Sequence, residues 1–131
     1  MNYDRNVIGK TLTEEYGIDP QFKIFRYAYR NNLEEAKARF IVRFKLKRMN
    51  VNANKLFSNL PKLILFRFRG FLAKYWLCNE ATGECMGVYH WATYEDAKRY
   101  SESIAMRFMK KRSVPGSVTF EITKLESLEK I

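Results

Sequence analysis

The chain has 131 residues, of which 47% are hydrophobic and 15% aromatic, and only 6 are Gly and 3 are Pro. These figures fit one folded domain and exclude a disordered chain. The sequence has no uncharged apolar run of about 18 residues and does not start like a secretion signal. We therefore expect no transmembrane helix, no secretion and a cytoplasmic protein. The excess behind the net charge of +10 lies in residues 36–79, which hold 11 Lys or Arg and no Asp or Glu, so we expect a positive surface that binds an anionic small molecule, a nucleic acid or an anionic membrane.

Residues 1–36 show no single strong period, and we interpret them as a helical N-terminal extension that precedes the main domain at residues 37–126. Asp19-Pro20 has the form of an N-cap followed by Pro at the first helical position. This pair predicts a short helix that ends at Tyr29 or Arg30. Residues 32–35 predict the start of a further helix.

The main domain begins with a change to period-two alternation. Between Ala38 and Arg48 apolar side chains alternate with mostly basic ones, which predicts a strand. Residues 52–66 carry Leu, Phe and Ile at helical spacing, so we expect a helix there that Pro61 breaks or restarts. The alternation returns in residues 71–78 and predicts the second strand.

A β-hairpin is expected around the turn-like residues 79–84, which connect the second strand to a third at Cys85–Trp91. If Cys78 opposes Cys85, the rest of the register follows. It pairs Trp76 with Gly87, Lys74 with Tyr89, Leu72 with Trp91, Tyr75 with Val88, and Ala73 with His90.

The last helix and strand have clear boundaries. Thr93 followed by Asp96 predicts an N-cap, and the helix continues to the basic residues at 110–112. Pro115-Gly116 ends it, and alternation in residues 117–124 predicts a final strand. The apolar stripe of the helix is expected to be Ala97, Tyr100, Ile104, Ala105 and Phe108.

The order strand, helix, strand, strand, helix, strand is that of α+β ferredoxin-like domains, with two helices on one face of a four-stranded antiparallel sheet. We name the face under the helices the helix face and the other one the opposite face. On the helix face we expect Phe40, Val42, Phe44, Tyr75, Leu77, Val88, His90, Val118, Phe120 and Ile122. On the opposite face we expect Arg43, Lys45, Lys47, Lys74, Trp76, Tyr89, Trp91, Thr119 and Glu121. Three large aromatic side chains are a poor solvent surface, so the opposite face should bind a ligand or another subunit.

Residues 70–124 also carry a family resemblance. The stretch GFLAKYWLCNEATGECMGVYHWATYEDAKRY followed by MRFMKKRSVPGSVTFEI resembles the YdhR-like group of monooxygenases in the dimeric α+β barrel superfamily. The similar features are the aromatic-rich strand, the ETG-type turn, the GVY-x-W strand with its following helix, and the VPGS-type entry to the last strand. The resemblance covers roughly residues 37–124.

The resemblance implies a homodimer in which two ferredoxin-like subunits pack their open sheet faces together, with a cavity between sheet and helices. Some relatives oxygenate aromatic polyketides or quinol-like compounds without a metal or an organic cofactor, and others degrade haem. The haem-degrading relatives place a His on the helix after the third strand, where this chain has none. The resemblance therefore implies a cofactor-independent monooxygenase-like protein.

Site residues follow from the aromatic and basic side chains of the strands. In a pocket for a planar or anionic molecule the aromatics would stack, and a basic group would hold an anionic oxygen; alternatively, the same residues form a dimer interface. The expected ligand-binding residues are Arg43, Lys45, Lys74, Trp76, Tyr89 and Trp91. Catalytic candidates are Lys74 and Tyr89, which with Arg43 can stabilise an enolate-like anion, and His90. A lone His without an acidic neighbour in the sequence favours a packed ring over a proton-transfer group.

Other functions remain as alternatives. Two Cys and one His do not complete a four-ligand metal site, and a cytosolic setting favours free thiols over a Cys78–Cys85 disulfide. The dimer can be a non-catalytic ligand-binding or structural protein. Single-stranded RNA can stack on a basic, aromatic sheet face, although Arg69-Gly70-Phe71 matches only the start of the RNA-recognition signature and lies on the second strand rather than the third. A membrane-surface role of the first 35 residues is disfavoured because they are not net basic.

Overall fold

The computed structural model describes residues 2–3, 5–30, 36–47 and 68–125, which form one antiparallel sheet with short helices. The strands are β1 (Asn2–Tyr3), β2 (Lys23–Tyr29), β3 (Ala38–Lys45), β4 (Phe71–Asn79), β5 (Glu84–Trp91) and β6 (Thr119–Lys124). The helices are the 3-10 turn η1 (Arg5–Val7), α1 (Thr13–Tyr16), α4 (Tyr94–Ser101) and α5 (Ile104–Arg112).

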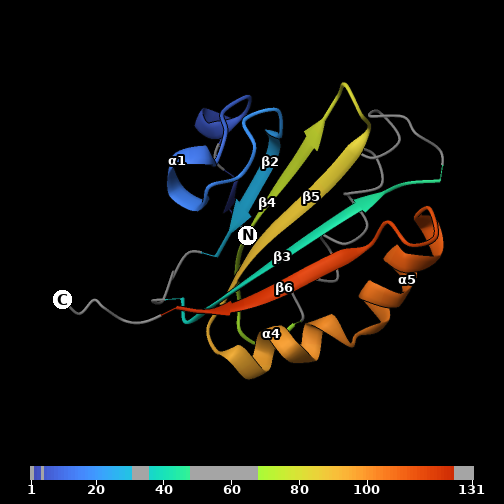
Figure 1. Ribbon diagram of the computed structural model, residues 1–131. Helices are drawn as coiled ribbons and strands as arrows, with labels where there is room; N and C mark the ends of the chain where they lie inside the picture. The colour runs from blue at the N-terminus through green and yellow to red at the C-terminus, as the bar shows by residue number, and fades with distance from the viewer. Residues whose placement is uncertain (1, 4, 31–35, 48–67, 126–131) are drawn as a thin grey trace.

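The ferredoxin-like fold predicted from the sequence is confirmed. The described strands lie in the order β1-β2-β4-β5-β3-β6, so β6, β3, β5 and β4 have the arrangement expected of the four predicted strands (Figure 1). The sheet is wider than predicted because β1 and β2 extend it beyond β4. The predicted helix over 52–66 and the helix start at 32–35 lie outside the described residues.

The predicted helix after Asp19-Pro20 is wrong, because residues 23–29 form strand β2. Asp19 instead closes a turn: its side-chain oxygen accepts from the backbone N–H of Gln21 at 2.8 Å, and its carbonyl accepts from that of Phe22 at 3.0 Å. The following KIFRYAY is rich in β-forming aromatic residues, and β4 offers an edge with which it pairs. The segment interpreted as a helical extension therefore supplies a strand of the main sheet.

The predicted hairpin register is confirmed over most of its length. Cys78 pairs with Cys85, and the pairs expected at Trp76, Lys74, Tyr75 and Ala73 all occur. Only the last pair differs, since an irregularity between Phe71 and Ala73 places Phe71 rather than Leu72 opposite Trp91. Such a bulge adds one residue to one strand and shifts the alternation beyond it.

The face assigned to this hairpin was wrong. Phe40 of β3 pairs directly with Tyr89, and Val42 with Gly87. Directly paired residues of antiparallel strands share a face, so Tyr89, Trp91 and the paired Lys74 and Trp76 lie on the helix face. The residues that lie instead on the opposite face are Tyr75, Leu77, Val88 and His90.

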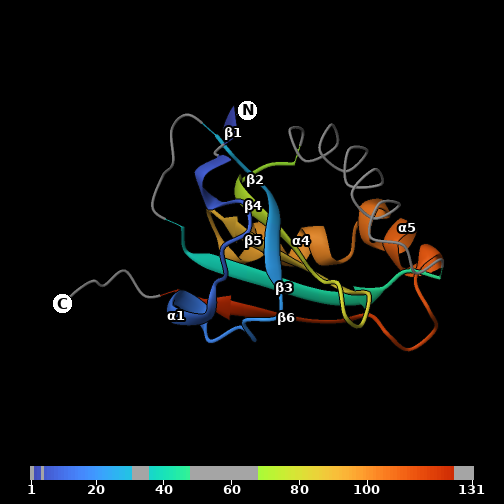
Figure 2. The same cartoon turned by 90° about the horizontal axis from the view of Figure 1, so that it is seen from above.

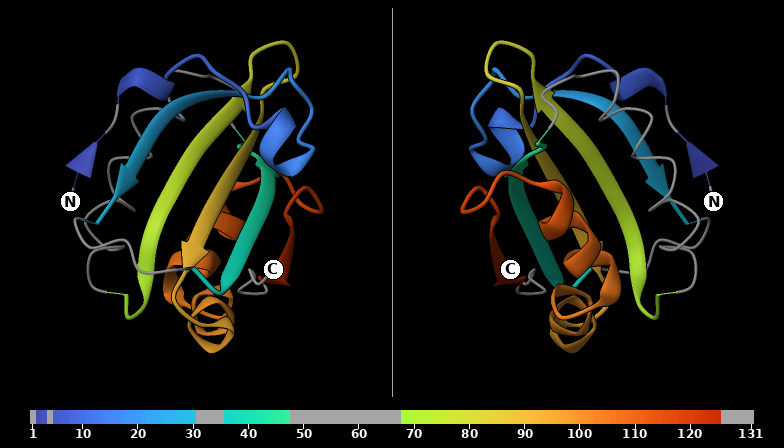
Figure 3. Two further views of the ribbon diagram at one scale, coloured as in Figure 1. Left: turned by 90° about the vertical axis from the view of Figure 1, so that its left-hand side faces the viewer. Right: turned by 90° about the vertical axis from the view of Figure 1, so that its right-hand side faces the viewer.

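Both faces of the sheet are covered, which explains the wrong assignment. Helices α4 and α5 lie on the helix face, and α1 lies on the opposite face (Figures 2 and 3). Strands β4 and β5 are therefore apolar or aromatic on both sides, and their pattern does not reveal which side meets the helices. The core under α4 and α5 contains Phe40, Val42, Trp76, Tyr89, Trp91, Tyr100, Met106 and Met109, and the core under α1 contains Leu12, Ile18, Phe22, Ile24, Leu77, Met86 and Val88.

The helix predicted from Thr93 to Arg112 is two helices. The Thr93 side chain accepts from the Asp96 backbone N–H at 3.0 Å, as predicted, but the chain turns at Glu102 and Ser103 caps α5 anew. This break shifts the helical phase, so that Ile104, predicted in the core, is 77% exposed while Met106 and Met109 are buried. Neither helix, nor any other in the described part of the chain, is long and apolar enough to cross a membrane.

Candidate functional site

Five side chains on the helix side of the sheet form a buried cluster that we name the aromatic cluster: Lys74, Trp76, Tyr89, Trp91 and Tyr100. Strands β4 and β5 supply the first four and α4 supplies Tyr100. The Tyr100 ring centroid lies 4.9 Å from that of Tyr89 and 5.2 Å from that of Trp91. Each of the five residues is at most 5% exposed, so the cluster is nearly dry. The face-sharing of the first four was predicted from the hairpin register, and their position under the helices was not.

Lys74 is the unusual member because its amine is buried without a carboxylate. The Nζ atom lies 4.4 Å from the ring centroid of Trp76 and 4.3 Å from that of Tyr89. The two ion pairs of the described residues join Arg43 to Glu84 and Arg99 to Asp96, and neither involves Lys74. Burial, with a smaller contribution from Arg26, holds the pKa of Lys74 well below its usual 10.5.

The strand opposite Lys74 leaves space for its stem. Gly87 pairs with Trp76, and a Cβ at Gly87 would lie 2.9 Å from Cε1 of Tyr89 and 3.2 Å from Cε of Lys74. The first distance is shorter than real Cβ contacts, so any larger residue displaces the ring or the lysine. A glycine at this position is therefore part of how the lysine is accommodated.

The aromatic cluster has more hydrogen-bond donors than acceptors. The hydroxyls of Tyr89 and Tyr100 lie 3.0 Å apart and form one hydrogen bond between them. Burial raises the pKa of Tyr89 well above 10 and that of Tyr100 to about 12, so both stay protonated at neutral pH. The indole Nε1 of Trp91 is buried and has no hydrogen-bond partner in the described structure. A buried donor without an acceptor costs about 1–3 kcal/mol, which an oxygen-bearing ligand would recover.

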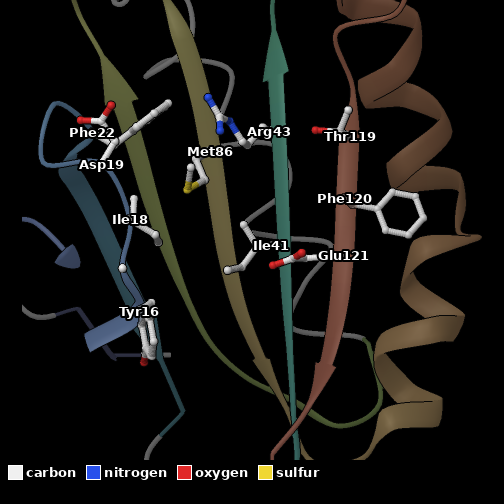
Figure 4. A pocket seen from close by; sticks show the side chains of 11 residues that line it. Tyr16, Ile18, Asp19, Phe22, Ile41, Arg43, Met86, Thr119, Phe120 and Glu121 are labelled. Atoms are coloured by element: carbon white, nitrogen blue, oxygen red, sulfur yellow. The ribbon is translucent and has the colours of Figure 1, made fainter. Parts of the chain in front are cut away.

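The remaining predicted binding residues, Arg43 and Lys45, do not join the aromatic cluster. Both alternate with Phe44 on β3 and therefore point to the opposite face. The Arg43 guanidinium donates to Glu84 at 2.8 Å and lies 5.2 Å over the Phe22 ring. It lines a pocket of about 360 Å³ between residues 12–22, which we name the α1 segment, and strands β3 and β6 (Figure 4). The six predicted residues are thus divided between the two faces.

His90 also lies on the opposite face, against α1, so its predicted place under the helices is wrong. Its Nε2 is 3.0 Å from the hydroxyl of Tyr16, and the Arg39 guanidinium stacks 4.2 Å over that tyrosine ring. Burial and the positive charge of Arg39 lower the pKa of His90 to about 4. The ring is therefore neutral at pH 7, and its surroundings are those of a packed side chain.

Sequence reasoning missed two neighbours of Lys74. Tyr100 was predicted on the apolar stripe of the last helix. Its place in the aromatic cluster depends on which face of the sheet meets the helices, and that face was assigned wrongly. Arg26, whose guanidinium lies 5.9 Å over the Trp76 ring, was missed because its segment was predicted as a helix. Recognising KIFRYAY as a strand would have placed it beside Trp76.

Metal-ligating side chains do not gather in the described part of the chain, where no group of three His, Cys, Asp or Glu side chains is close enough to hold an ion. Cys78 and Cys85 face each other across the hairpin, and both are buried. Burial, the neighbouring Cys78 and Glu84 raise the pKa of Cys85 to about 12, so this residue is a thiol rather than a reactive thiolate.

Comparisons with known proteins give structural similarity only. No protein-family model and no curated protein matches the sequence. Among solved structures, a heme-degrading enzyme from Listeria monocytogenes has a TM-score of 0.64 at 6% identity, over 79% of this chain and 69% of that one. A ferredoxin-fold protein related to antibiotic biosynthesis monooxygenases, also from Listeria monocytogenes, has 0.62 at 7%, over 77% and 62%. A monooxygenase-like protein from Listeria innocua has 0.62 at 9%, over 80% and 64%.

These similarities concern the fold, since all the identities lie below 10%. The chain spans less than two thirds of the length of two of these three proteins. All three are similar over most of this chain. The chain therefore has the ferredoxin-like fold of proteins related to antibiotic biosynthesis monooxygenases.

Proposed function

We propose that the chain is a cytoplasmic, cofactor-independent monooxygenase-like protein of the YdhR-like type that binds a small planar or anionic organic molecule at the aromatic cluster. The observation that carries the proposal is the donor-rich, acceptor-poor character of this cluster. Among the described residues, the buried N–H of Trp91 has no hydrogen-bond partner, and the buried amine of Lys74 has no ion pair with a carboxylate. A ligand with an oxygen atom on an aromatic body supplies what both residues lack.

The cluster also offers the chemistry that a cofactor-free oxygenation requires. Trp76, Tyr89 and Trp91 provide flat apolar surfaces for a planar ring. A reaction of this kind proceeds through an enolate- or phenolate-like anion, which fixed donors stabilise in a dry site more strongly than water does. Lys74 and Tyr89 are the proposed donors, whereas Arg43 and Lys45 are no longer part of the proposed set.

Tryptophan fluorescence tests binding directly, because the only two Trp residues of the chain both belong to the aromatic cluster. We expect saturable changes in emission with a quinol such as 1,4-dihydroxynaphthalene, and oxygen uptake above the rate of the quinol alone. Y89F and K74M should each lower the affinity for the quinol and the rate of oxygen uptake at least about tenfold, which corresponds to roughly 1.4 kcal/mol. The control K45M changes a lysine on the opposite face and should leave both unchanged.

The outcomes separate the alternatives. Saturable binding without oxygen uptake would support the non-catalytic ligand-binding alternative. Absence of binding for quinols and aromatic carboxylates would contradict the proposed site. Binding of single-stranded RNA is disfavoured, because the aromatic residues proposed to stack on bases are all buried on the helix face; salt-dependent retention of RNA would contradict this conclusion.

The proposal includes a homodimer that forms through the opposite face of the sheet. The α1 segment covers this face over β2, β4 and β5, where Leu12, Ile18 and Phe22 are buried. The strip over β3 and β6 stays partly open and contains the pocket of Figure 4. A partner subunit would pack on this strip and close the barrel.

A further inference from the structure

We infer that Lys74 is a nucleophilic amine that captures the carbonyl group of an aromatic aldehyde or ketone as an imine. The inference rests on the proposed function in one respect, since the carbonyl compound must reach the same aromatic cluster. It goes further in assigning a covalent step and a class of ligand.

The surroundings of Lys74 favour the neutral amine over the charged ammonium form. The residue is 3% exposed, and its stretch of sequence from residue 36 to residue 79 contains no Asp or Glu. The positive charge of Arg26 on β2, two residue pairs away along the β2–β4 ladder, also acts on this amine. Desolvation and a neighbouring cation are the two devices that activate lysines for attack on carbonyl groups.

These same features set the protonation state. An exposed lysine with a pKa near 10.4 is neutral in only about one molecule in 2,500 at pH 7. Burial and Arg26 both lower the pKa of Lys74, so a larger fraction of this lysine is neutral. The contacts of Nζ with the rings of Trp76 and Tyr89 favour the ammonium form, and they are too weak to offset complete burial.

A carbonyl compound at the aromatic cluster would meet both an aromatic surface and a hydrogen-bond donor. The aromatic body would stack on Trp76 or Tyr89, and the unpartnered Trp91 Nε1 can donate to the carbonyl oxygen. The lysine nitrogen attacks the carbonyl carbon to give a carbinolamine. Loss of water from it, with the oxygen taking two protons, leaves the C=N bond of the imine. No oxidant or metal is consumed in this step.

Reductive trapping tests the inference. The full chain is incubated with 4-hydroxybenzaldehyde and sodium cyanoborohydride, which delivers hydride to the imine carbon and makes the bond permanent. Peptide mapping by mass spectrometry should find Lys74 modified at least about tenfold faster at pH 7 than the exposed Lys98 and Lys110. Between pH 7 and pH 9 the rate of trapping on Lys74 should rise less steeply than the rate on the exposed lysines.

Two variants probe the site itself. K74R keeps a cation and should lose the fast adduct. G87A places a Cβ against Tyr89 and the lysine stem and should slow trapping at least about fivefold, with circular dichroism confirming that each variant is folded. Modification of Lys74 no faster than of the exposed lysines, or with the same pH dependence, would overturn the inference.

The outcome is distinguishable from failure of the proposed function. If hydroquinone, which has no carbonyl group, changes tryptophan emission but the aldehyde is not trapped on Lys74, the inference is wrong and the binding site stands. If Lys74 is trapped and quinols give no oxygen uptake, the inference stands without oxygenation. If neither occurs, both are wrong.

Discussion

Burial of Lys74 is costly for the fold, since desolvation of its amine is not offset by an acidic partner among the described residues. Proteins retain such residues where function requires them and lose stability in return. The buried N–H of Trp91, which has no hydrogen-bond partner in the described part of the chain, adds to this cost. Two destabilising polar groups in one aromatic cluster therefore indicate a site.

Replacement of Lys74 by Met should stabilise the protein. Met fills a similar volume without an amine to desolvate, so we expect the free energy of unfolding to rise by about 1–3 kcal/mol. Urea denaturation followed by circular dichroism measures the change. The control K45M, on a half-buried lysine of β3, should shift the free energy by less than about 0.5 kcal/mol. A loss of stability in K74M would show that the amine has a favourable partner.

Protonation of His90 should destabilise the fold at acidic pH. Its pKa falls from 6.5 to about 4 on folding, so the unfolded chain binds the extra proton between these values. Stability from this residue is therefore complete above pH 6.5 and is lost as the pH falls towards 4, by at most about 3 kcal/mol. Denaturation of the wild type and H90Q at pH 4, 5, 6 and 7 should show a smaller loss in H90Q. Equal losses in both proteins would contradict the buried, neutral histidine.

The sequence could predict which residues of the aromatic cluster share a sheet face, but it could not predict what that face packs against. Alternation placed Lys74, Trp76, Tyr89 and Trp91 on one face, and the structure confirms this. Pairing with β3 decides which face meets the helices, and this depends on long-range contacts that a strand with two apolar faces does not reveal.

Among the elements, the α1 segment is a structural part of the sheet domain. Phe22, directly before β2, is 1% exposed and packs with Leu77, Met86 and Val88 on the opposite face. The C-terminal end of α1 is closed by Gly17 in the left-handed conformation, which redirects the chain towards Ile18. We expect the segment to unfold together with the sheet.

Truncation of Phe22 tests this expectation. F22A should lower the free energy of unfolding by about 3–4 kcal/mol, because a buried ring is lost and a cavity remains. F120A removes a ring of the helix face that is 44% exposed, and it should cost less than about 1 kcal/mol. Chemical denaturation compares the two variants. Similar costs for both would mean that the α1 segment does not contribute to the core.

The elements were predictable where local signals and tertiary contacts agree. The Thr93 cap and the alternation of β3 and β6 are local, and both are confirmed. Strand β2 was not predicted because Asp19-Pro20 is compatible with a helix start as well as with a turn, and pairing with β4 selects the turn. The break at Ser103 was missed because a serine in the middle of a helical pattern is also compatible with an ordinary polar position on the exposed side of one continuous helix.

For the whole molecule, the two covered faces differ in what they leave accessible. Helices α4 and α5 cover the helix face but leave a pocket of about 580 Å³ between themselves and β6, and the opposite face keeps an open strip at β3 and β6. Glu121 lies on this strip and is exposed. Assembly of two copies through this strip is the simplest way to cover it.

Light scattering coupled to size exclusion measures this assembly. We expect twice the chain mass of 15.6 kDa at micromolar concentration. E121R adds like charge on both sides of a twofold contact and should shift the protein towards the monomer. The control E95R alters an exposed residue of α4, on the other side of the sheet, and should remain dimeric. A monomeric wild type would contradict the barrel.

The sequence by itself determined the ferredoxin-like order of strands and helices, the hairpin register and the concentration of charge, because periodicity, caps and turn residues act locally. Only the tertiary structure decided that Lys74 and its aromatic neighbours lie on the helix face, that His90 packs against Tyr16, and that residues 23–29 join the sheet. These outcomes depend on which of two similar faces pairs with a distant element. That choice is made by the sum of packing contacts over the whole sheet, which no single strand encodes.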